Sequence, residues 1–89
     1  MEKIFYVYVL KSKKDDGFYI GQTNNVEARL IRHNQGRVKS TKHRIPLELV
    51  RFEIFKSRAE GMKQEKYLKS LKGGNKWKLL LQQWGVAKW

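Results

Sequence analysis

Residues 4–22 read IFYVYVLKSKKDDGFYIGQ, and this stretch decides the fold. The apolar, β-branched and aromatic run predicts a strand over residues 4–10 that is covered on both faces and therefore lies inside a sheet. Residues 11–17 are polar and carry a turn signal, and residues 18–22 predict a returning strand. The two strands thus form an antiparallel hairpin. Gly21, inside the second strand, predicts a close approach of backbone or ligand there.

Outward from this hairpin, the pattern predicts three helices and one further strand. The expected elements are a helix over residues 26–34, a strand over 46–55, and helices over 58–71 and 76–84. The order β-β-α-β-α-α predicts an α+β protein in which a small three-stranded sheet is flanked by helices. We expect one domain over residues 1–89, because the chain has room for a single core. Loop length leaves the direction of the third strand open, since a helix connects it to the hairpin.

Polar residues at the expected helix starts predict three caps. Asn24 lies three residues before Glu27 and resembles a capping box, and Ser57 gives the same signal with Glu60. Asn75 is expected to cap the last helix. Gly36 and the pair Gly73-Gly74 are expected to end the first and second helices.

The charge of the chain is strongly positive. Its 89 residues include 20 Lys and Arg against 8 Asp and Glu, a net charge of +12. Acidic residues are absent from residues 28–47 and after Glu65, where the cations concentrate. Concentrated positive charge raises affinity for polyanions through counterion release, so nucleic acid is the expected partner. A solvated surface without a specific partner is the alternative.

The remaining composition excludes several classes of protein. The chain has no cysteine, which excludes a disulfide framework and a thiolate metal site. No run of about 18 apolar residues predicts a membrane span, and the start lacks the cleavage region of a signal peptide. We therefore expect a cytoplasmic protein without a membrane partner.

Two tyrosines, an arginine and a histidine are the candidate catalytic residues. Tyr8 and Tyr19 lie on the two hairpin strands, which could bring both phenol oxygens to one face. A phenol has a pKa of about 10, so a base role at neutral pH requires a nearby cation or metal. Arg29 and His33 lie four residues apart on one helix, where a guanidinium could hold phosphate oxygens and an imidazole could shuttle a proton. The structural alternatives are packing rings, a solvated arginine, and a surface histidine at the helix C-terminus.

Glu65 is the carboxylate in the middle of the 58–71 helix and the candidate metal ligand. One carboxylate suffices for Mg²⁺, which keeps several waters and takes further ligands from phosphate. The alternative is an exposed ion pair with Lys69, four residues later. Trp77 and Trp84 are seven residues apart on one helical face, a spacing more typical of core packing than of base stacking.

Taken together, these residues resemble the GIY-YIG nuclease superfamily, especially its small stand-alone members related to the nuclease domain of the bacterial excinuclease. The similarity covers about residues 3–72, most of the chain. The matching segments are Tyr6-Val7-Tyr8, Tyr19-Ile20-Gly21, residues 23–29, His33-Asn34 with Gly36, Ser40-Thr41, Pro46 and residues 65–69. At two positions the chain departs from the pattern, because the family's opening glycine is Tyr6 here and its isoleucine is Val7.

The resemblance implies a three-stranded antiparallel sheet flanked by helices, and hydrolysis of DNA phosphodiester bonds with Mg²⁺ or Mn²⁺. Tyr8 would activate the attacking water or relay its proton, and Tyr19 would support Tyr8 across the hairpin. Arg29 would hold and neutralise the scissile phosphate, and His33 could share the proton relay. Glu65 would bind the metal, which would stabilise the departing 3′ oxygen.

The resemblance leaves the substrate and one family residue open. Asn75 is the candidate for the family asparagine that follows the glutamate helix. The chain shows no separate targeting domain, so sequence preference is expected to be weak or supplied by a targeting protein partner. DNA, branched or single-stranded, is the expected substrate, and RNA stays open. The alternative function is a non-catalytic nucleic-acid-binding module that keeps the fold, and a small basic protein docking on RNA or a ribonucleoprotein is a third.

Overall fold

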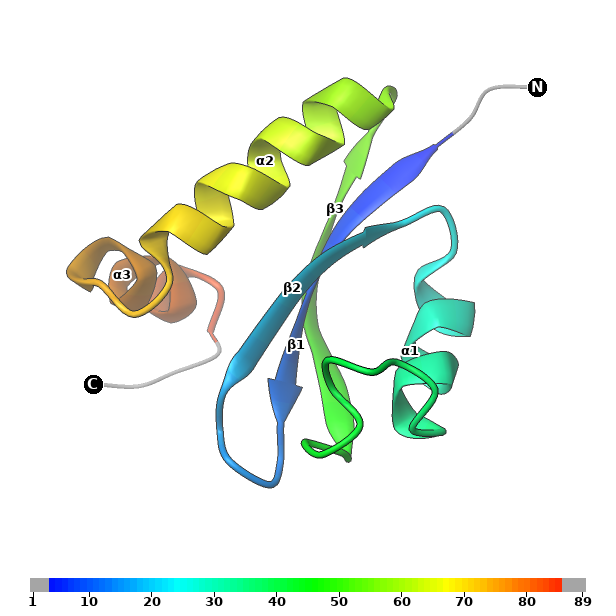
Figure 1. The fold of residues 1–89 in the computed structure, drawn as a ribbon. Coiled ribbons are helices and arrows are strands. Elements are labelled where there is room, and N and C mark those ends of the chain that lie inside the picture. Colours follow the sequence, from blue (N-terminus) through cyan, green and yellow to red (C-terminus); the bar gives the residue numbers. More distant parts are fainter. Residues whose placement is uncertain (1–3, 86–89) are drawn as a thin grey trace.

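The structure, a computed structural model, describes residues 4–85 and contains three strands and three helices (Figure 1). The elements are β1 (Phe5–Ser12), β2 (Phe18–Thr23), α1 (Val26–Asn34), β3 (Leu47–Phe55), α2 (Arg58–Leu71) and α3 (Asn75–Gln83). The predicted α+β class and the order β-β-α-β-α-α are confirmed. Strand formers dominate all three strands, and the helices carry the unbranched residues that helices favour.

The three strands form one antiparallel sheet in the order β2-β1-β3, so β1 is central, as its two apolar faces predict. β1 and β2 pair Tyr8 with Gly21 and Leu10 with Tyr19. β1 also pairs antiparallel with β3, which settles the strand direction that loop length leaves open. The β1–β3 register shifts between Val9 and Leu10. Because side chains alternate along each strand, Tyr8, Leu10 and Tyr19 all lie on one face of the sheet.

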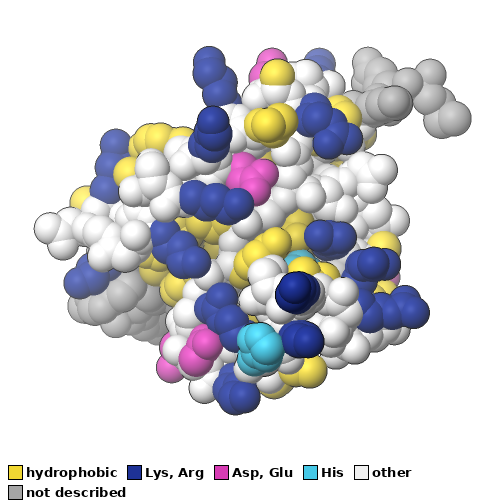
Figure 2. Space-filling view, in the orientation of Figure 1, with side chains coloured by type: hydrophobic (Ala, Val, Ile, Leu, Met, Phe, Trp, Pro, Cys, Tyr) yellow, Lys and Arg dark blue, Asp and Glu magenta, His cyan; other side chains and the backbone are white. Residues whose placement is uncertain are grey.

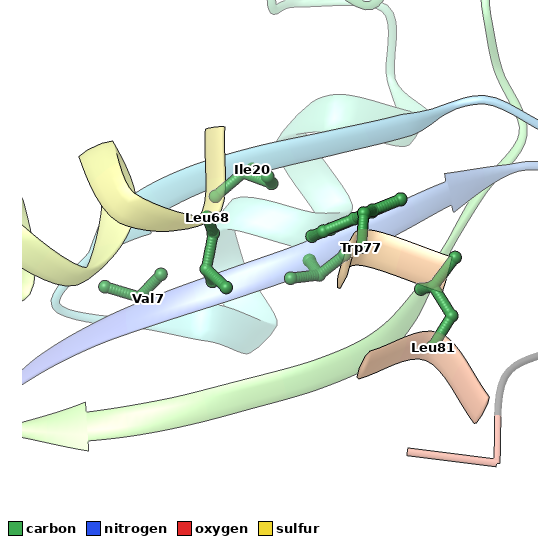
Figure 3. Close-up of a cluster of buried hydrophobic side chains, with 6 residues drawn as sticks. Val7, Ile20, Leu68, Trp77 and Leu81 are labelled. Carbon is green, nitrogen blue, oxygen red and sulfur yellow. The ribbon is translucent and has the colours of Figure 1, made fainter. Parts of the chain in front are cut away.

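The helices cover opposite faces of this sheet, with α1 on one side and α2 with α3 on the other (Figure 1). The α2–α3 face holds the larger core, in which Trp77 and Leu68 cover the β1 and β2 side chains (Figure 3). The buried members of this core are Val7, Val9, Ile20, Leu68, Trp77 and Leu81. Trp77 also meets Trp84 edge to face at 5.9 Å, so the tryptophan pair packs in the core as its spacing predicts.

The second core lies between the sheet and α1. Its buried members are Tyr8, Leu10 and Leu47, and Leu30 of α1 packs against them. The same face of β1 therefore supplies both apolar packing and a phenol. This position fixes the Tyr8 ring between the sheet and α1.

Two of the predicted caps are wrong and one is confirmed. Ser57 accepts a hydrogen bond from the Glu60 amide and caps α2 as expected. α1 is capped by Asn25, whose side chain accepts from the Ala28 amide at 3.0 Å. The prediction of Asn24 as the cap is wrong by one residue. β2 runs to Thr23, and the residue with the extended backbone of an N-cap is Asn25. Asn75 is already the first residue of α3, and Gly74 at the N-cap offers no side chain.

Both predicted stop signals of the first two helices fit the structure. Gly36 follows α1 with a φ of 74°, and Gly73 follows α2 with a φ of 88°. Positive φ is the left-handed region that glycine enters without a steric cost. In each case the glycine lets the chain change direction after the helix, toward β3 after α1 and into α3 after α2.

The longest helix, α2, has 14 residues. A helix that spans a bilayer needs about 20 mostly apolar residues. Among residues 4–85, none of the helices has both the length and the apolar character for such a span.

Candidate active site

The hairpin and α1 bring Tyr8, Tyr19 and His33 into mutual ring contact. The ring centroids of Tyr8 and Tyr19 are 6.2 Å apart, and His33 lies 5.8 Å from Tyr8 and 5.0 Å from Tyr19. Two of these rings come from adjacent strands and the third from the helix above them. Residues separated by up to 25 positions in sequence thus share one cluster.

A series of hydrogen bonds runs through this cluster. Arg29 Nε donates to the Tyr8 hydroxyl oxygen at 3.4 Å, and that oxygen lies 2.9 Å from His33 Nε2. His33 Nδ1 in turn lies 2.7 Å from Thr41 Oγ1. Tyr8, His33 and Thr41 are all buried, so their contacts lie away from bulk water.

The hydrogen-bond partners assign a direction to this series. Thr41 Oγ1 donates to the Val38 carbonyl at 3.5 Å, so it is free to accept from His33 Nδ1–H. His33 Nε2 then carries the lone pair and accepts the Tyr8 hydroxyl proton. The Tyr8 oxygen accepts from Arg29 in the same arrangement. Each of these hydrogen bonds is satisfied with His33 in the Nδ1-protonated tautomer, which is an assignment from the network.

Burial moves the pKa values of the two titratable groups in opposite directions. Burial raises the pKa of Tyr8 to about 12, with the charges of Tyr19 and Glu65 adding to the rise and the Arg29 hydrogen bond opposing it. Burial lowers the pKa of His33 to about 4, and the positive charge of Arg29 lowers it further. Both groups are therefore neutral near pH 7. The alternative of His33 as a surface histidine at the helix C-terminus is wrong, because its side chain is fully buried beneath α1.

Arg29 is the cation of the cluster. Its hydrogen bond to Tyr8 raises the pKa of the guanidinium, and Tyr19 adds a smaller contribution in the same direction. The Tyr8 contact uses Nε, which leaves the two terminal nitrogens for another partner. Arg29 is partly buried, and its guanidinium contacts Tyr8, so the alternative of an arginine that only meets solvent is wrong.

Glycines let α2 and Tyr8 approach β2 from its two sides. A Cβ at Gly21 would lie 2.6 Å from the Tyr8 hydroxyl oxygen, so the predicted close approach at this glycine is made by the Tyr8 side chain. A Cβ at Gly61 of α2 would lie 2.6 Å from Gln22 Nε2 of β2. The missing side chain at Gly61 lets α2 lie against β2, and the missing side chain at Gly21 admits the Tyr8 ring on the other face.

Glu65 of α2 acts on the cluster electrostatically. Its carboxylate contributes to the raised pKa of Tyr8, and its side chain is 22% exposed. Lys69 Nζ lies 2.8 Å from Glu65 Oε2, so the i,i+4 pair that helical spacing predicts is present. Asn75, by contrast, lies exposed at the first position of α3.

The donor set at Glu65 fits one kind of metal site. Within residues 4–85 there is no cluster of three or more His, Cys, Asp or Glu side chains that could hold a metal ion. A cage built only from protein ligands is therefore not available in that part of the chain. One half-buried carboxylate does fit Mg²⁺, which keeps several waters and takes its remaining oxygens from a bound phosphate.

A hollow of about 720 Å³ opens over this cluster. Tyr19 and Arg29 form part of its lining, together with Lys39, Lys42 and His43 from the loop between α1 and β3. Three cationic side chains around one hollow create a positive potential that favours an anionic ligand.

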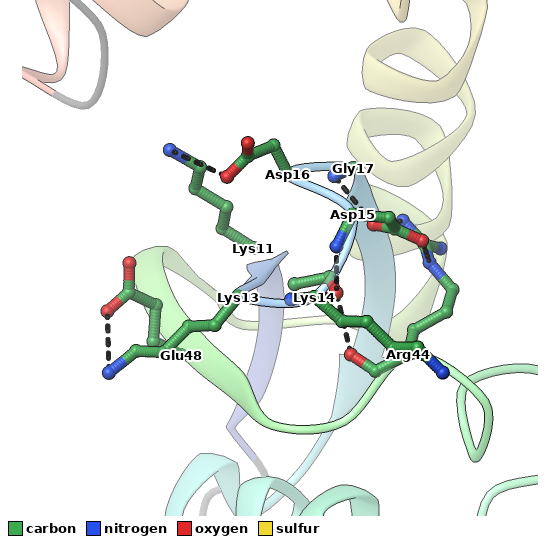
Figure 4. Close-up of polar contacts among 9 residues, drawn as sticks. Lys11, Lys13, Lys14, Asp15, Asp16, Gly17, Arg44 and Glu48 are labelled. Atoms are coloured by element: carbon green, nitrogen blue, oxygen red, sulfur yellow. Dashed lines mark hydrogen bonds and ion pairs between the residues drawn. The ribbon is translucent and has the colours of Figure 1, made fainter.

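The loop that carries Thr41 and these lysines is fixed to the β1–β2 turn (Figure 4). Arg44 Nε donates to Asp15 Oδ2 at 3.0 Å, and the Ser12 hydroxyl donates to the Arg44 carbonyl at 2.6 Å. Hydrogen bonds from the Gly17 amide and from Arg44 lower the pKa of Asp15. Sequence reasoning missed this connection and the role of Thr41, because both depend on contacts between segments far apart in the chain.

Cations dominate the face seen in Figure 2, with few acidic side chains among them. Burial lowers the pKa of Lys72, and the positive charges of Arg44 and Lys69 lower it further. These three cations are therefore electrostatic neighbours, although they come from α2, its C-terminal end and the 37–46 loop. This face has the electrostatic character of a polyanion-binding surface.

Known proteins share this architecture. A family model described as the GIY-YIG catalytic domain matches residues 4–78. A UPF0213 protein from Clostridium perfringens is 43% identical over 76 residues, which cover 84% of this chain and 81% of that relative. A UPF0213 protein from Natronomonas pharaonis is 42% identical over 81 residues, covering 90% and 94% of the two chains.

A solved structure agrees with these relatives. The solution NMR structure of a UPF0213 protein from Bacillus halodurans is 35% identical with a TM-score of 0.58, covering 92% of this chain and 87% of that chain. The resemblance that rested on two tyrosine-centred strands is thus supported by both sequence and fold. The matched residues 4–78 include the whole sheet, α1, α2 and the start of α3, and with them every residue of the cluster. The chain belongs to the GIY-YIG family.

Proposed function

We propose that this chain is a divalent-metal-dependent endonuclease that hydrolyses DNA phosphodiester bonds with little sequence preference. The observation that carries the proposal is the hydrogen-bonded series Arg29–Tyr8–His33 beneath a cation-lined hollow. The charge of Glu65 on α2 also acts on Tyr8. Family membership supports nuclease chemistry on a nucleic acid, usually with a divalent metal. The hollow supplies a place for a phosphate, and the cluster supplies groups that move a proton and neutralise charge.

Arg29 neutralises the scissile phosphate. Its Nε holds Tyr8, and its terminal nitrogens are available for two phosphate oxygens in a fork geometry. The Arg29 guanidinium would thus contact both Tyr8, the proposed general base, and the scissile phosphate. The negative charge that builds on the phosphate oxygens in the transition state strengthens this contact.

Tyr8 and His33 move the proton of the attacking water. The Tyr8 oxygen accepts a proton from the water while its own proton passes to His33 Nε2, 2.9 Å away. The water oxygen forms the new bond to phosphorus, and the bond to the 3′ oxygen breaks to leave an alkoxide that solvent protonates. Because His33 is fully buried, the relay resets in reverse: His33 Nε2 returns its proton to the Tyr8 oxygen, which releases the other proton to water. This relay avoids a free phenolate, which a Tyr8 pKa of about 12 makes unfavourable at neutral pH.

Two other residues complete the arrangement. Tyr19 packs against both rings and lines the hollow, where it supports the attacking water across the hairpin. Glu65 would hold Mg²⁺ or Mn²⁺, whose positive charge would stabilise the departing 3′ oxygen. Thr41 acts as a positioning residue, because its hydroxyl holds His33 in the tautomer that can accept the Tyr8 proton.

Two observations favour a second candidate function. Lys69 already occupies an oxygen of Glu65, and the Tyr8 pKa of about 12 opposes the phenolate form. Both features suit a nucleic-acid-binding module that keeps the GIY-YIG fold without turnover. Such a module binds DNA in a salt-dependent way and cleaves nothing with any metal.

A cleavage panel separates the two functions. Wild-type protein is incubated with single-stranded, double-stranded and branched DNA in Mg²⁺, in Mn²⁺ and in EDTA, and Arg29→Ala is compared with Arg58→Ala. Arg58 is an exposed arginine at the start of α2, away from the hollow over the cluster, and is therefore the matched control. We expect metal-dependent cleavage that Arg29→Ala reduces by about 10²-fold or more and Arg58→Ala largely retains. Equal cleavage by Arg29→Ala and wild type would reject the role of Arg29, and no cleavage by wild type would favour the binding module.

A further inference from the structure

A second hollow lies on the same sheet face as Tyr8, at the start of α1. Its volume is about 570 Å³, and its lining includes Tyr6, Asn24, Asn25, Glu27, Phe52 and Ile54. Tyr6 lies two residues before Tyr8 on β1, and Phe52 of β3 pairs with Tyr8. Side chains two residues apart on a strand share a face, so this hollow continues the surface that carries the catalytic phenol.

The hollow has exposed apolar walls. Phe52 is 48% exposed and Ile54 59% exposed, although both belong to a strand of the sheet. Tyr6 and Phe52 meet edge to face with ring centroids 5.8 Å apart. This geometry leaves ring surface open to solvent next to a polar wall of two asparagines. Exposed aromatic rings beside a cationic surface are the means by which proteins hold unpaired bases.

The charge of this hollow differs from that of its neighbour. None of the described residues that line it is Lys or Arg, and Glu27 gives it one carboxylate. The adjacent hollow of about 380 Å³ shares Asn24 and Asn25 with it but is lined by Arg29, Arg32 and Arg37. The arginine hollow suits phosphate groups. The aromatic hollow repels them, but it can stack a ring and hydrogen-bond base edges through amide and carboxylate groups.

We infer that the hollow between Tyr6, Phe52 and Ile54 is a subsite for an unpaired nucleobase, next to the position of the scissile phosphate. A strand bound with its phosphates along Arg29, Arg32 and Arg37 places a base across the shared asparagines and onto the Tyr6–Phe52 pair. The subsite rests on the proposed function in that it takes a nucleic-acid strand as the ligand. It predicts that single-stranded segments, including those of branched DNA, bind better than fully paired duplex, whose bases are not available for stacking.

The probe is a short oligothymidylate that carries one 2-aminopurine, whose fluorescence falls when it stacks on an aromatic ring. It is titrated in EDTA, as a single strand and as a duplex, so that no cleavage intervenes. The test variant is Phe52→Thr, which removes the ring and puts a β-branched strand former in its place. The matched control is Leu79→Ala, which removes an apolar side chain of similar exposure from α3 on the other side of the sheet.

We expect quenching of the single-stranded probe by wild type and by Leu79→Ala. Phe52→Thr is expected to lose the quenching and to bind the single strand roughly tenfold more weakly, while its duplex affinity stays the same. Equal losses for both probes, or retained quenching in Phe52→Thr, would overturn the subsite. So would a wild-type dimer that Phe52→Thr converts to a monomer in light scattering, because the face would then bind a second copy of the chain.

The outcome separates this subsite from the nuclease activity. Quenching that depends on Phe52 in a protein that never cleaves with Mg²⁺ or Mn²⁺ would keep the subsite and reject the nuclease. Cleavage with identical binding by Phe52→Thr and wild type would reject the subsite alone. A wild-type protein that binds neither probe would reject both.

Discussion

At Tyr8, one hydroxyl oxygen joins a cation to a neutral imidazole. Arg29 donates to that oxygen, and the hydroxyl proton points to His33 Nε2. The buried surroundings keep both Tyr8 and His33 uncharged at neutral pH. In the proposed mechanism, Tyr8 can therefore donate its proton and His33 can accept it once a phosphate is bound. This combination of a buried phenol and a buried imidazole makes the stability of the protein depend on pH.

We predict that the free energy of unfolding falls as the pH drops from 6.5 toward 4. The pKa of His33 is about 4 in the folded protein and about 6.5 in the unfolded chain. Between these pH values the unfolded chain binds a proton at His33 and the folded protein does not. The stabilisation is fully present above the unfolded pKa and is lost as the pH falls through this window, by about 3 kcal/mol. Urea denaturation of wild type and His33→Gln at several pH values measures it. A wild-type pH profile in this window that matches His33→Gln would contradict the assignment.

Thr41 should control the His33 tautomer. Thr41→Val keeps the volume but leaves His33 Nδ1 without its partner, at a cost of about 1–3 kcal/mol. Thr41→Ser keeps the hydroxyl and should retain the wild-type tautomer. The ¹⁵N shifts of the His33 ring distinguish the two tautomers, and cleavage assays should show a loss in Thr41→Val that Thr41→Ser restores. Unchanged ring shifts in Thr41→Val would show that Thr41 does not set the tautomer.

Sequence alone indicated part of this cluster. Tyr8, Tyr19, Arg29 and His33 stand out by residue type and by family pattern, yet the burial of His33 was not predicted. A signal was present, because Val26, Leu30 and His33 follow the i, i+4, i+7 spacing of one apolar helix face. Thr41 gave no local signal of its role, since its contact with His33 forms only when the 37–46 loop folds back over α1.

At the scale of elements, the first hairpin determines the geometry of the site. Gly21 faces Tyr8 directly across the β1–β2 ladder, and the lack of a side chain at Gly21 admits the phenol. The second determinant is the loop between α1 and β3, which Arg44 and Ser12 fix to the hairpin turn. The Tyr8 ring and this loop both lie on the face of the sheet that α1 covers.

Gly21→Ala should therefore disable the site. The added Cβ would lie 2.6 Å from the Tyr8 oxygen and 2.7 Å from its Cζ, so the ring must move away from Arg29 and His33. We expect a loss of stability of about 1–3 kcal/mol and a larger loss of cleavage than the loss of stability explains. Gly74→Ala, whose added Cβ comes no closer than 3.3 Å to its nearest neighbour, serves as the control in thermal denaturation and cleavage assays. Wild-type cleavage by a folded Gly21→Ala protein would contradict this account.

Elements were more predictable than their ends. The strands and helices follow from apolar periodicity and glycine stops, which act locally, and the structure confirms their order. The caps of α1 and α3 were each misplaced by one residue, because the extended cap conformation depends on where the preceding strand or turn stops. The antiparallel direction of β3 needed the family resemblance, since a helical connection permits either direction.

At the scale of the molecule, a net charge of +12 on 89 residues should make electrostatics a main contributor to the affinity for the proposed DNA substrate. The sheet separates the larger core, which α2 and α3 cover, from the cluster and the three hollows on the other face; Glu65, on α2, is the proposed site residue that comes from the core side. The cations that contact DNA should therefore be those around the hollows, and α3 should contribute little.

Salt dependence tests this division. Affinity for duplex DNA should fall steeply with salt, and Lys42→Gln should weaken binding uniformly across sequences and reduce the slope of log K against log[salt] by about 1. Lys42 lines the larger hollow, whereas Lys78 lies on α3 and is the matched control. Fluorescence anisotropy at several salt concentrations gives the slopes. An equal reduction in Lys78→Gln would show that DNA does not favour the α1 face.

The most direct test of the proposed endonuclease is the metal dependence of cleavage by Glu65→Gln. Glu60→Gln on the same helix is the control, and both proteins are assayed over a Mg²⁺ titration with the DNA that wild type cleaves best. Lys69 pairs with Glu65 in the structure, so the metal must compete with an ammonium for the carboxylate. We predict Mg²⁺-dependent cleavage by wild type and Glu60→Gln. Glu65→Gln should lose orders of magnitude in cleavage rate while it retains its DNA affinity in EDTA. Cleavage by Glu65→Gln at the wild-type rate and the wild-type Mg²⁺ requirement would contradict this prediction.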